Sequence, residues 1–371
     1  MKILLAIWSL ASENGGPTRS TIGLSLALSK AGANVTLFSN VPGTVSPETV
    51  NILKAAGVNF REGRGNSYFT ALNDSRMILR EVHPDVVHVQ GLWKLSSHAM
   101  NVAARHLGVP IVISPRGMLD PWALGVKKWK KKVGMLLYQK RDLKYATAFH
   151  ATATVEAENI RNFGLSQQIY TIPNGVSVPE QMPSIGDSTN MHTALFLSRL
   201  HPGKGLLLLA EAWARVRPKG WRMVVVGGDV KNHRVQVETR LKVLRIDQDW
   251  EFTGELDDIK KWEAFAAADL FIHPSASENF GISIAEALSA GVPVITTKGC
   301  PWAEIDGYCG WWIDRSVDAL TNAMKLAITM SDEERGVLGE KGKRLIRAKF
   351  TWPAIGAQMS KVYAEIIQNN G

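Results

Sequence analysis

Cysteine is scarce in this sequence. The two cysteines, Cys300 and Cys309, have neither the spacing of a metal site nor further cysteines with which to build a disulfide framework, so we expect free thiols in a reducing compartment. An uninterrupted apolar stretch of about 18 residues is also missing, and a membrane-spanning helix is therefore not expected. The sequence has no internal repeat or low-complexity tract, and its scattered Gly and Pro exclude collagen-like and disordered classes.

The chain is long enough for more than one domain. Its 371 residues, 45% of them hydrophobic, can bury two cores, and typical domain sizes favour two domains over one. The apolar residues 1–8 resemble a signal peptide, but they run directly into a glycine loop. We interpret them as the first strand of the fold.

Acidic residues are under-represented in the first half of the chain. Residues 1–185 hold 20 Lys and Arg against 11 Asp and Glu, whereas residues 186–371 hold 23 of each kind, so the net charge of +9 belongs to the first half. Residues 127–144 alone hold eight basic residues and one acidic residue. One short segment therefore supplies most of the imbalance.

Strand and helix patterns alternate along both halves, which predicts parallel sheets covered on both faces. The breaker-rich stretch between residues 172 and 191 is typical of an interdomain linker. We therefore predict an α/β fold with two Rossmann-like halves. The expected strands are 3–8, 35–39, 86–89, 110–114, 149–152, 193–198, 223–226, 250–253, 270–273 and 294–297, and the expected helices include 18–31, 282–290 and 352–368.

The segment 274–293 contains the most informative motif. It follows a buried strand, and within it Glu278 and Glu286 lie eight positions apart around a helix that opens after Gly281. In a parallel sheet such a loop faces the ligand crevice, where helix N-termini bind phosphate. Carboxylates do not bind phosphate, but they bind hydroxyls. The pattern therefore indicates a ligand that carries sugar rings beside a phosphate, such as a nucleotide sugar.

Two structural alternatives apply to these carboxylates when each is taken alone. Ser283 and Glu286 have the spacing of a capping box, in which the serine caps the helix and the glutamate bonds back to it. Glu278 alone is also compatible with an ordinary solvated loop acid.

Three motifs in order along the chain resolve these alternatives by resemblance. The Glu278-x7-Glu286 segment, the upstream stretch Ser198-Arg199-Leu-His-Pro-Gly203-Lys204-Gly205 and the early loop Asn14-Gly15-Gly16 resemble the retaining glycosyltransferases of family 4. The likeness covers nearly the whole chain. It implies a GT-B fold, in which two Rossmann-like domains face each other across a cleft. Residues 1–177 would bind the acceptor, 178–351 would bind the nucleotide-sugar donor, and the helix 352–371 would cross back to the first domain.

The chemistry of such a transfer requires cations at the leaving diphosphate, because negative charge builds there as the sugar departs. Arg199 and Lys204 follow a strand end, and glycines beside the lysine allow close backbone approach. By resemblance these two residues are the diphosphate pair. Gly15 and Gly16, between the first strand and the first helix, would place bare backbone N–H groups at the donor phosphate or the acceptor.

The resemblance also implies roles around the transferred sugar. Glu278 would hold its hydroxyls, Phe280, Gly281 and Ile282 would offer backbone contacts, and Glu286 would bind the ribose. A front-face mechanism with retention of anomeric configuration is the hypothesis, with no cofactor and no metal. The Asp-x-Asp motif at residues 247–249 formally matches metal-dependent glycosyltransferases, but we interpret it as a solvated turn.

Two positions of the first half depart from the pattern of the resembling family. His88 ends a strand where relatives often carry His-x-His, and Arg116 precedes Gly117 where many relatives have a histidine. Both are candidate acceptor-binding residues. For His88, a structural role is the alternative.

The basic segment 126–145 has Val126, Trp129, Val133, Leu136 and Leu137 at helical spacing beside its lysines, as in an interfacial amphipathic helix. Anionic lipid attracts such a patch by about 1 kcal/mol per basic residue. A solvated surface helix is the simpler alternative, and a nucleic-acid patch ranks last because no nucleic-acid fold motif accompanies it. The expected membrane contacts are Lys127, Lys128, Trp129, Lys130, Lys131 and Lys132.

The resemblance, together with the basic segment, implies a metal-independent hexosyltransferase at the cytoplasmic face of the inner membrane. It would use a UDP- or GDP-linked sugar and a glycan or polyprenyl-linked acceptor in bacterial surface polysaccharide or lipopolysaccharide synthesis. A nucleotide-sugar epimerase on the same fold and a non-catalytic membrane adaptor are the rival hypotheses.

Overall fold

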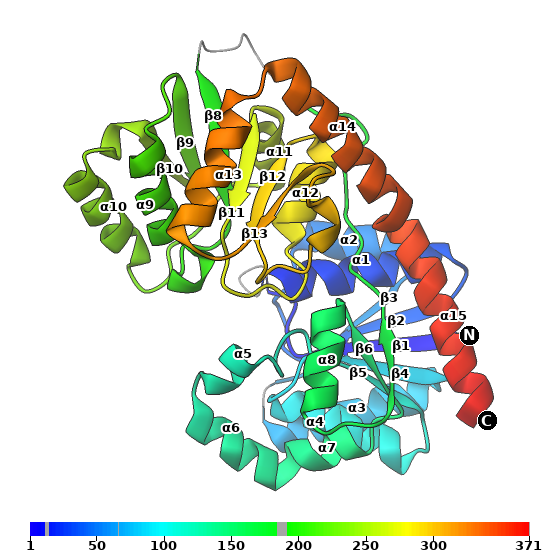
Figure 1. Ribbon diagram of the computed structural model, residues 1–371. Helices are drawn as coiled ribbons and strands as arrows, with labels where there is room; N and C mark the ends of the chain where they lie inside the picture. The colour runs from blue at the N-terminus through cyan, green and yellow to red at the C-terminus, as the bar shows by residue number, and fades with distance from the viewer. Residues whose placement is uncertain (12–14, 66, 184–190, 371) are drawn as a thin grey trace. The chain divides into compact units, whose positions relative to one another are not determined.

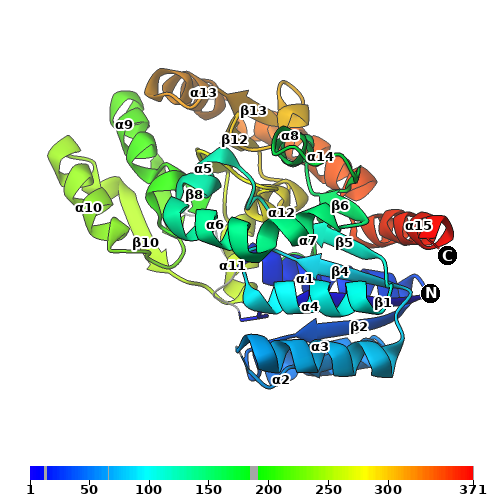
Figure 2. The ribbon, with the colours of Figure 1, turned by 90° about the horizontal axis from the view of Figure 1, so that it is seen from below.

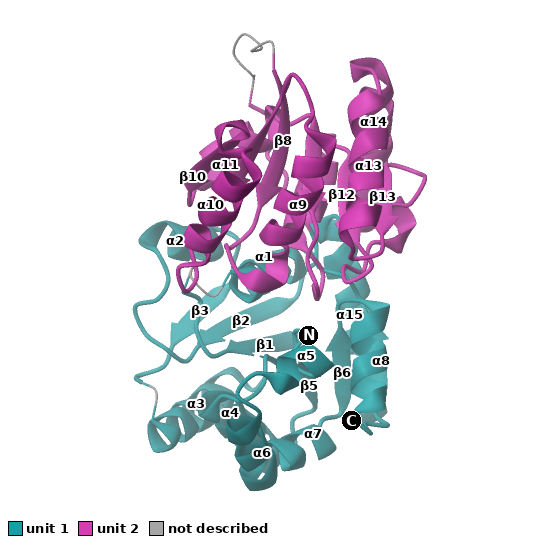
Figure 3. Cartoon of the chain, turned by 60° about the vertical axis from the view of Figure 1, so that its left-hand side comes forward, with its two compact units in different colours: residues 1–175, 351–371 teal, residues 176–350 magenta. Residues whose placement is uncertain are grey.

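A computed structural model describes residues 1–11, 15–65, 67–183 and 191–370. The chain forms two compact units (Figure 3). Unit 1 comprises Met1–Gly175 and Thr351–Gly371, and unit 2 comprises Val176–Phe350. The sequence placed these divisions at 177/178 and 351/352, one or two residues further along the chain.

Unit 1 is built on a seven-stranded sheet in the order β3-β2-β1-β4-β5-β6-β7, and every pairing is parallel (Figure 1). Its strands are β1 (Lys2–Ile7), β2 (Asn34–Ser39), β3 (Asn59–Glu62), β4 (Val86–Gln90), β5 (Ile111–Ser114), β6 (Ala148–Ala151) and β7 (Gln168–Thr171). Its helices are α1 (Gly16–Lys30), α2 (Pro47–Ala55), α3 (Tyr68–Val82), α4 (Leu95–His106), α5 (Pro121–Gly125), α6 (Lys128–Gly134), a π-helical turn (Met135–Gln139), α7 (Lys140–Lys144), α8 (Thr154–Asn162) and α15 (Trp352–Asn370).

Unit 2 has a six-stranded parallel sheet in the order β10-β9-β8-β11-β12-β13. Its strands are β8 (His192–Leu197), β9 (Trp221–Val226), β10 (Trp250–Gly254), β11 (Leu270–His273), β12 (Val294–Thr297) and β13 (Gly310–Ile313). Its helices are α9 (Leu206–Val216), α10 (His233–Leu244), α11 (Asp258–Ala266), α12 (Ile282–Ala290), α13 (Val317–Thr329) and α14 (Asp332–Lys349), with 3-10 turns at Pro202–Lys204, Asp247–Asp249 and Ala303–Ile305.

Helices cover both faces of each sheet, and consecutive strand residues point to opposite sides, so each strand contributes to two cores. In β1, Ile3 and Leu5 join a core that includes α1 and α15, whereas Leu4 and Ala6 join a second core with α3 and α4. Unit 2 repeats this plan, with separate cores on the two faces of its sheet. Because helices cover the faces, the loops at the carboxyl-terminal ends of the strands are the expected place for functional residues in both units.

The C-terminal helix α15 belongs to unit 1, where it packs on α1. Its first residue, Trp352, lies against two glycines. A Cβ atom on Gly23 or Gly175 would stand 2.1 or 2.4 Å from the indole, so neither position can carry a larger residue without moving the ring. Tyr363 on the same helix is fully buried in the core of unit 1.

The strands expected from sequence all form, with small shifts at their ends. Three further strands were not predicted, namely β3, β7 and β13, each at or next to an edge of its sheet. In β3 and β7 no residue is fully buried, so these strands lack the apolar run from which the others were predicted.

Candidate active site

The loops after β8 and β11 meet at the point where the strand order of unit 2 reverses. Strands β8 and β11 are neighbours, but the chain leaves β8 towards β9 on one side and returns to β11 on the other. In open parallel sheets, ligands bind outside the carboxyl ends of the strands at such a switch point. Lys204 follows β8, and Glu278 follows β11.

These two loops are joined by their backbones. The N–H of Ala276 donates to the carbonyl of Gly203 at 2.8 Å. Gly205 has φ +82°, and a Cβ atom there would stand 2.2 Å from the carbonyl oxygen of Pro274. Glycine is therefore needed both for the conformation and for the close approach. Two motifs more than 60 residues apart in sequence are thus fixed side by side.

Glu278 is the centre of a triad with Lys204 and His273. Its Oε1 forms an ion pair with the ammonium of Lys204 and lies 2.8 Å from Nε2 of His273. The exposed fractions of the side chains are 14% for Glu278, 19% for Lys204 and 1% for His273. A carboxylate and a cation thus stand together at the switch point, largely shielded from water but not sealed.

The triad keeps Glu278 ionised. Burial alone would raise the pKa of this carboxyl, but the charge of Lys204 and the hydrogen bond from His273 outweigh burial and hold the pKa well below its usual range. Behind the carboxylate, burial and the Glu278 charge raise the pKa of the Cys300 thiol to about 12. Cys300 and Cys309 are both buried free thiols, as predicted.

Arg199, the second cation predicted for the diphosphate, is exposed at the end of β8. Its charge and that of Lys204 both reach His201. Burial lowers the pKa of His201, and Lys204, His233 and Arg199 lower it further in that order. The two predicted cations therefore share one neighbourhood, although only Lys204 has a carboxylate partner in the described part of the chain.

Glu286 lies inside helix α12 rather than at a cap. The N-cap is Gly281 with φ +80°, and no side chain caps this helix. The capping box of Ser283 and Glu286 is therefore wrong. Glu286 instead pairs with Lys261 of α11 at 2.8 Å, and both side chains are more than 90% buried.

The predicted backbone contacts around Gly281 divide into two groups. The carbonyl of Phe280 accepts the indole N–H of Trp302 at 2.5 Å, and the Phe280 ring is buried, so this carbonyl is already engaged. Gly281 and Ile282 open the uncapped helix, where free N–H groups favour an anion. Of the three residues, only Gly281 and Ile282 offer backbone N–H groups at a helix N-terminus, as expected of a phosphate contact.

The predicted glycine loop of unit 1 also opens an uncapped helix. Gly15 is the N-cap of α1 with φ +65°, and Gly16 is the first helical residue. No side chain caps this helix. Asn14, the first residue of the motif, lies outside the described residues.

His88 does not have the acceptor-binding geometry that was considered for it. The residue is fully buried, with Nδ1 2.6 Å from the Tyr363 hydroxyl and Nε2 2.7 Å from Ser114 Oγ. Both ring nitrogens are therefore used inside unit 1. Burial first, and then the charges of His150 and Arg116, lower the pKa of His88, so the ring is neutral. His88 ties α15 to the sheet.

Arg116 has an unusual backbone conformation for a non-glycine residue, with φ +56°. Its Nε donates to Gln90 Oε1 and its Nη1 to Asn174 Oδ1, both at 2.9 Å. The side chain is thus fixed at the carboxyl edge of the unit 1 sheet. Its role towards an acceptor stays a prediction.

The basic segment forms a nearly continuous helical run from α6 through the π-helical turn to α7 (Figure 2). The helix begins at Lys128 rather than at 126, because Lys127 has φ +52°. Three of its large apolar residues point to solvent: the exposed fractions are 75% for Trp129, 85% for Leu136 and 72% for Leu137. The buried face combines apolar and polar residues: Leu143 and Met135 pack in the core of unit 1, and Asp142 pairs with His98 of α4 at 2.8 Å. No helix in the described part of the chain has the length and apolar character needed to cross a bilayer.

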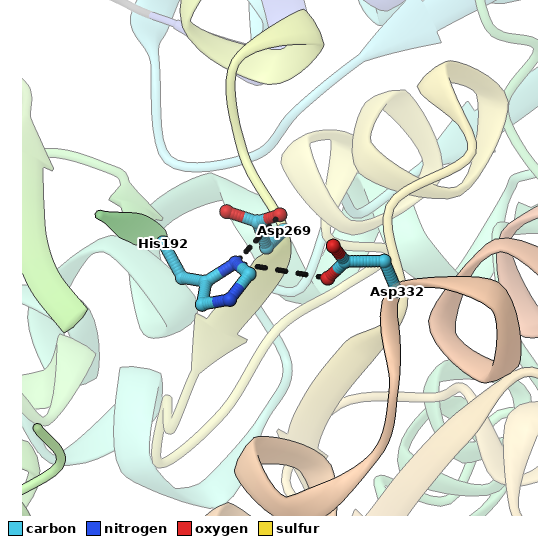
Figure 4. Close-up of side chains that lie close together, drawn as sticks. All are labelled: His192, Asp269 and Asp332. Carbon is cyan, nitrogen blue, oxygen red and sulfur yellow. Dashed lines mark ion pairs between the residues drawn. The ribbon is translucent and has the colours of Figure 1, made fainter. Parts of the chain in front are cut away.

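A separate cluster of His192, Asp269 and Asp332 lies at the opposite edge of the unit 2 sheet, where β8 and β11 begin (Figure 4). His192 Nδ1 is 3.3 Å from Asp269 and 3.8 Å from Asp332. Arg335 also pairs with Asp332, and Asp269 accepts the N–H of Thr193 at 2.7 Å. These partners give the cluster the character of a structural ion-pair network.

Two residues of the site were not anticipated from sequence. His273 ends a strand and directly precedes Pro274, five residues before its partner Glu278, so its position was a usable signal. Lys261 lies 25 residues before Glu286 on another helix, and no local pattern connects them.

Comparison with known proteins agrees with this geometry. A model described as Glycosyltransferase Family 4 matches residues 14–179, and one described as Glycosyl transferases group 1 matches residues 177–345. A GDP-mannose-dependent alpha-mannosyltransferase of Mycolicibacterium smegmatis is 28% identical over 78% of this chain and 76% of its own length. A D-inositol 3-phosphate glycosyltransferase of Xylanimonas cellulosilytica is 25% identical over 95% and 92%.

Solved structures show the same fold. The HepE protein of Anabaena, 19% identical, aligns over 98% of this chain and 100% of its own with a TM-score of 0.77. Sucrose-phosphate synthase of Thermosynechococcus elongatus, 17% identical, aligns over 100% of both chains with a TM-score of 0.78. Two parallel-sheet α/β units of this kind match the GT-B fold of glycosyltransferases. Within that class, the chain belongs to the family 4, group 1 glycosyltransferases.

Proposed function

We propose that this glycosyltransferase moves a sugar, with retention of configuration, from a UDP- or GDP-linked donor to a glycan or lipid-linked acceptor in bacterial cell-surface polysaccharide synthesis. The main support is the Lys204–Glu278 pair at the switch point of unit 2. The HepE structure was solved with UDP and glucose, and the M. smegmatis relative is named for GDP-mannose. Both therefore concern nucleotides or nucleotide sugars of the proposed kind.

In this proposal the ion pair changes partners when the donor binds. Lys204 and Arg199 bind the diphosphate and stabilise the charge that develops as the bond to the anomeric carbon breaks. Glu278, ionised because of Lys204 and His273, accepts hydrogen bonds from hydroxyls of the transferred sugar. Glu286 binds the ribose hydroxyls, and the leaving phosphate takes the proton of the acceptor. No residue is assigned as a nucleophile.

The activity test compares three variants of the full chain. Lys204→Ala should lower turnover by roughly 100-fold, because one charge-stabilising group is removed from the departing diphosphate. Glu278→Gln keeps the shape but loses the charge and should also lower turnover severely. Glu333→Gln, an exposed acid on α14, is the matched control. Full turnover in Glu278→Gln with an unchanged circular dichroism spectrum would refute the assignment.

Donor, stereochemistry and metal dependence have separate readouts. Thermal stabilisation by a panel of UDP- and GDP-sugars identifies the base and sugar. Proton NMR of the product gives the anomeric configuration. We expect turnover to survive a chelator, because Lys204 and Arg199 take the place of a metal ion at the diphosphate. If a chelator abolishes turnover and added Mg²⁺ or Mn²⁺ restores it, the proposed metal independence is wrong.

We further propose that the run α6–α7 attaches the protein to the inner face of the cytoplasmic membrane. Trp129, Leu136 and Leu137 are exposed beside Lys128, Lys130 and Lys132, so apolar contact and attraction to anionic lipid act together. Trp129→Glu should weaken flotation with anionic liposomes. Ile259→Glu, which changes a side chain of similar exposure (72%) in unit 2, should not. Equal flotation of both variants and the parent would dismiss this attachment.

A further inference from the structure

His273 belongs to the triad of unit 2, although none of the sequence motifs includes it. It is the last residue of β11, its side chain is 1% exposed, and its Nε2 lies 2.8 Å from Oε1 of Glu278. The proposed contacts with the donor involve Lys204 and Glu278, and they leave His273 without a role.

The imidazole of His273 makes a single hydrogen bond, and its direction is defined. An ionised carboxylate has only acceptors, so Nε2 carries the hydrogen of the bond to Glu278. Nδ1, on the other side of the ring, is buried and has no hydrogen-bond partner within the described residues. Such nitrogens are rare, because they lose their hydration without compensation. A histidine kept for stability would use both nitrogens, as His88 does in unit 1.

The position of this ring is fixed by its surroundings. Its plane is within 17° of the Phe196 ring and 10° of the Phe271 ring, with centroids 5.8 and 5.9 Å away. Both phenyl rings are fully buried. The backbone carbonyl of His273 accepts the hydroxyl of Thr296 at 2.8 Å. Moving the imidazole would therefore require the closely packed core around it to rearrange.

The two donors to Glu278 use the same oxygen. Lys204 and His273 both bind Oε1, and within the described part of the chain no group binds Oε2. Lys204 carries its ammonium on a flexible four-carbon stem, and in the proposed function it moves to the diphosphate when the donor binds. His273 then remains as the fixed donor on Oε1, and Oε2 stays open to a ligand.

We propose that His273 is a positioning residue of the donor site: it holds Glu278 by Oε1 while Lys204 turns to the diphosphate, so that Oε2 accepts a hydroxyl of the transferred sugar. This inference rests on the proposed function, because it assumes that Glu278 binds the sugar. His273 itself acts only through Glu278. Without it, Glu278 loses its fixed position when the ion pair opens, and the sugar contributes less to binding.

Three substitutions at position 273 separate the hydrogen bond from the packing of the ring. His273→Phe keeps an aromatic ring beside the two phenyl rings but has no donor. His273→Gln places an amide NH₂ group where Nε2 lies, whereas His273→Asn, one carbon shorter, places it where Nδ1 lies. Because only Nε2 has a partner, we expect glutamine, and not asparagine, to replace the histidine.

Calorimetry on the full chain measures the affinity of each variant for UDP-glucose and UDP, and for GDP-mannose and GDP. The ratio of the affinities for sugar nucleotide and free nucleotide should fall roughly tenfold in His273→Phe and His273→Asn, because a hydrogen bond to a charged group carries about that factor. His273→Gln should restore most of the ratio. His106→Gln, which changes an exposed histidine at the end of α4, should alter none of these affinities.

The outcomes distinguish the role of His273 from the proposed function. If the parent binds a sugar nucleotide and the ratio is unchanged in His273→Phe, the role of His273 alone is overturned, even when both affinities fall. A loss that His273→Gln does not restore, or that His273→Asn restores equally well, also overturns it. A parent that binds none of the four ligands, or a ratio unaltered in Glu278→Gln, overturns the proposed function itself and the sugar contact with it.

Discussion

Replacing Lys261 by methionine should destabilise unit 2 by about 3 kcal/mol. Lys261 and Glu286 form a buried ion pair at 2.8 Å, with side chains only 8% and 6% exposed. Removing one partner of such a pair leaves an uncompensated buried charge, which costs about 3–5 kcal/mol.

Calorimetric unfolding provides the measurement. For a domain of the size of unit 2, residues 176–350, a loss of this magnitude lowers Tm by roughly 6–12 °C. Lys260→Met is the matched control, because Lys260 lies on the same helix but is exposed, and it should change Tm little. If both variants unfold at the same temperature, the buried pair does not have the stabilising role assigned to it.

The double variant Lys261→Met with Glu286→Gln separates stability from function. Neutralising Glu286 removes the charge that has lost its Lys261 partner, so much of the lost Tm should return. UDP and GDP binding should stay weak, because the proposed ribose ligand is gone. A double variant that regains both stability and nucleotide affinity would remove Glu286 from the donor site.

Three further outcomes follow from single positions. Gly205→Ala should destabilise the fold more than Gly32→Ala. Both glycines have positive φ, but only at Gly205 would a Cβ atom clash with the backbone. Equal losses of Tm in the two variants would contradict this. The pKa of Glu278 is held low, so its ionised form stabilises the fold above the ordinary carboxyl pKa. The Tm of the parent should therefore exceed that of Glu278→Gln by a constant amount from pH 8 to 5, and the difference should shrink as pH falls below about 4. A difference at pH 3 as large as at pH 7 would count against the triad. Tyr363→Phe should cost about 1–3 kcal/mol in urea unfolding, because it leaves a buried histidine nitrogen without a partner, and an unchanged midpoint would argue against this bond.

Local signals explain which parts of the fold could be predicted. Strand β11 and helix α12 were predicted to the residue, because Pro274 and Gly291 end an apolar strand and an apolar helix. The basic segment was predicted as one helix from 126, yet it begins at Lys128 and contains a π-helical turn. No periodicity of side chains distinguishes such a turn from an ordinary one.

The candidate site was predictable only as far as its individual residues. Glu278, Lys204 and Glu286 carry motif signals, but which cation pairs with which carboxylate depends on how separate loops and helices pack. Lys204 meets Glu278 because of the backbone contact between their loops, and Lys261 meets Glu286 because α11 packs on α12. His88 shows the reverse case: a structural role was the alternative given for it, but its buried partner Tyr363 lies 275 residues away, so that partner could not be predicted from its own strand.

The assignment of α15 to unit 1 has a consequence for synthesis on the ribosome. The core of unit 1 includes Ile355, Met359 and Tyr363, and these residues are translated after the whole of unit 2. Domains usually fold in the order in which they emerge. Here the first-made sheet must wait, with one apolar face covered by α1 but not yet by α15, while the second-made unit has its complete sequence earlier. The nascent chain therefore exposes part of a hydrophobic surface from the completion of this sheet until α15 is made, and that face is where a holding chaperone would act.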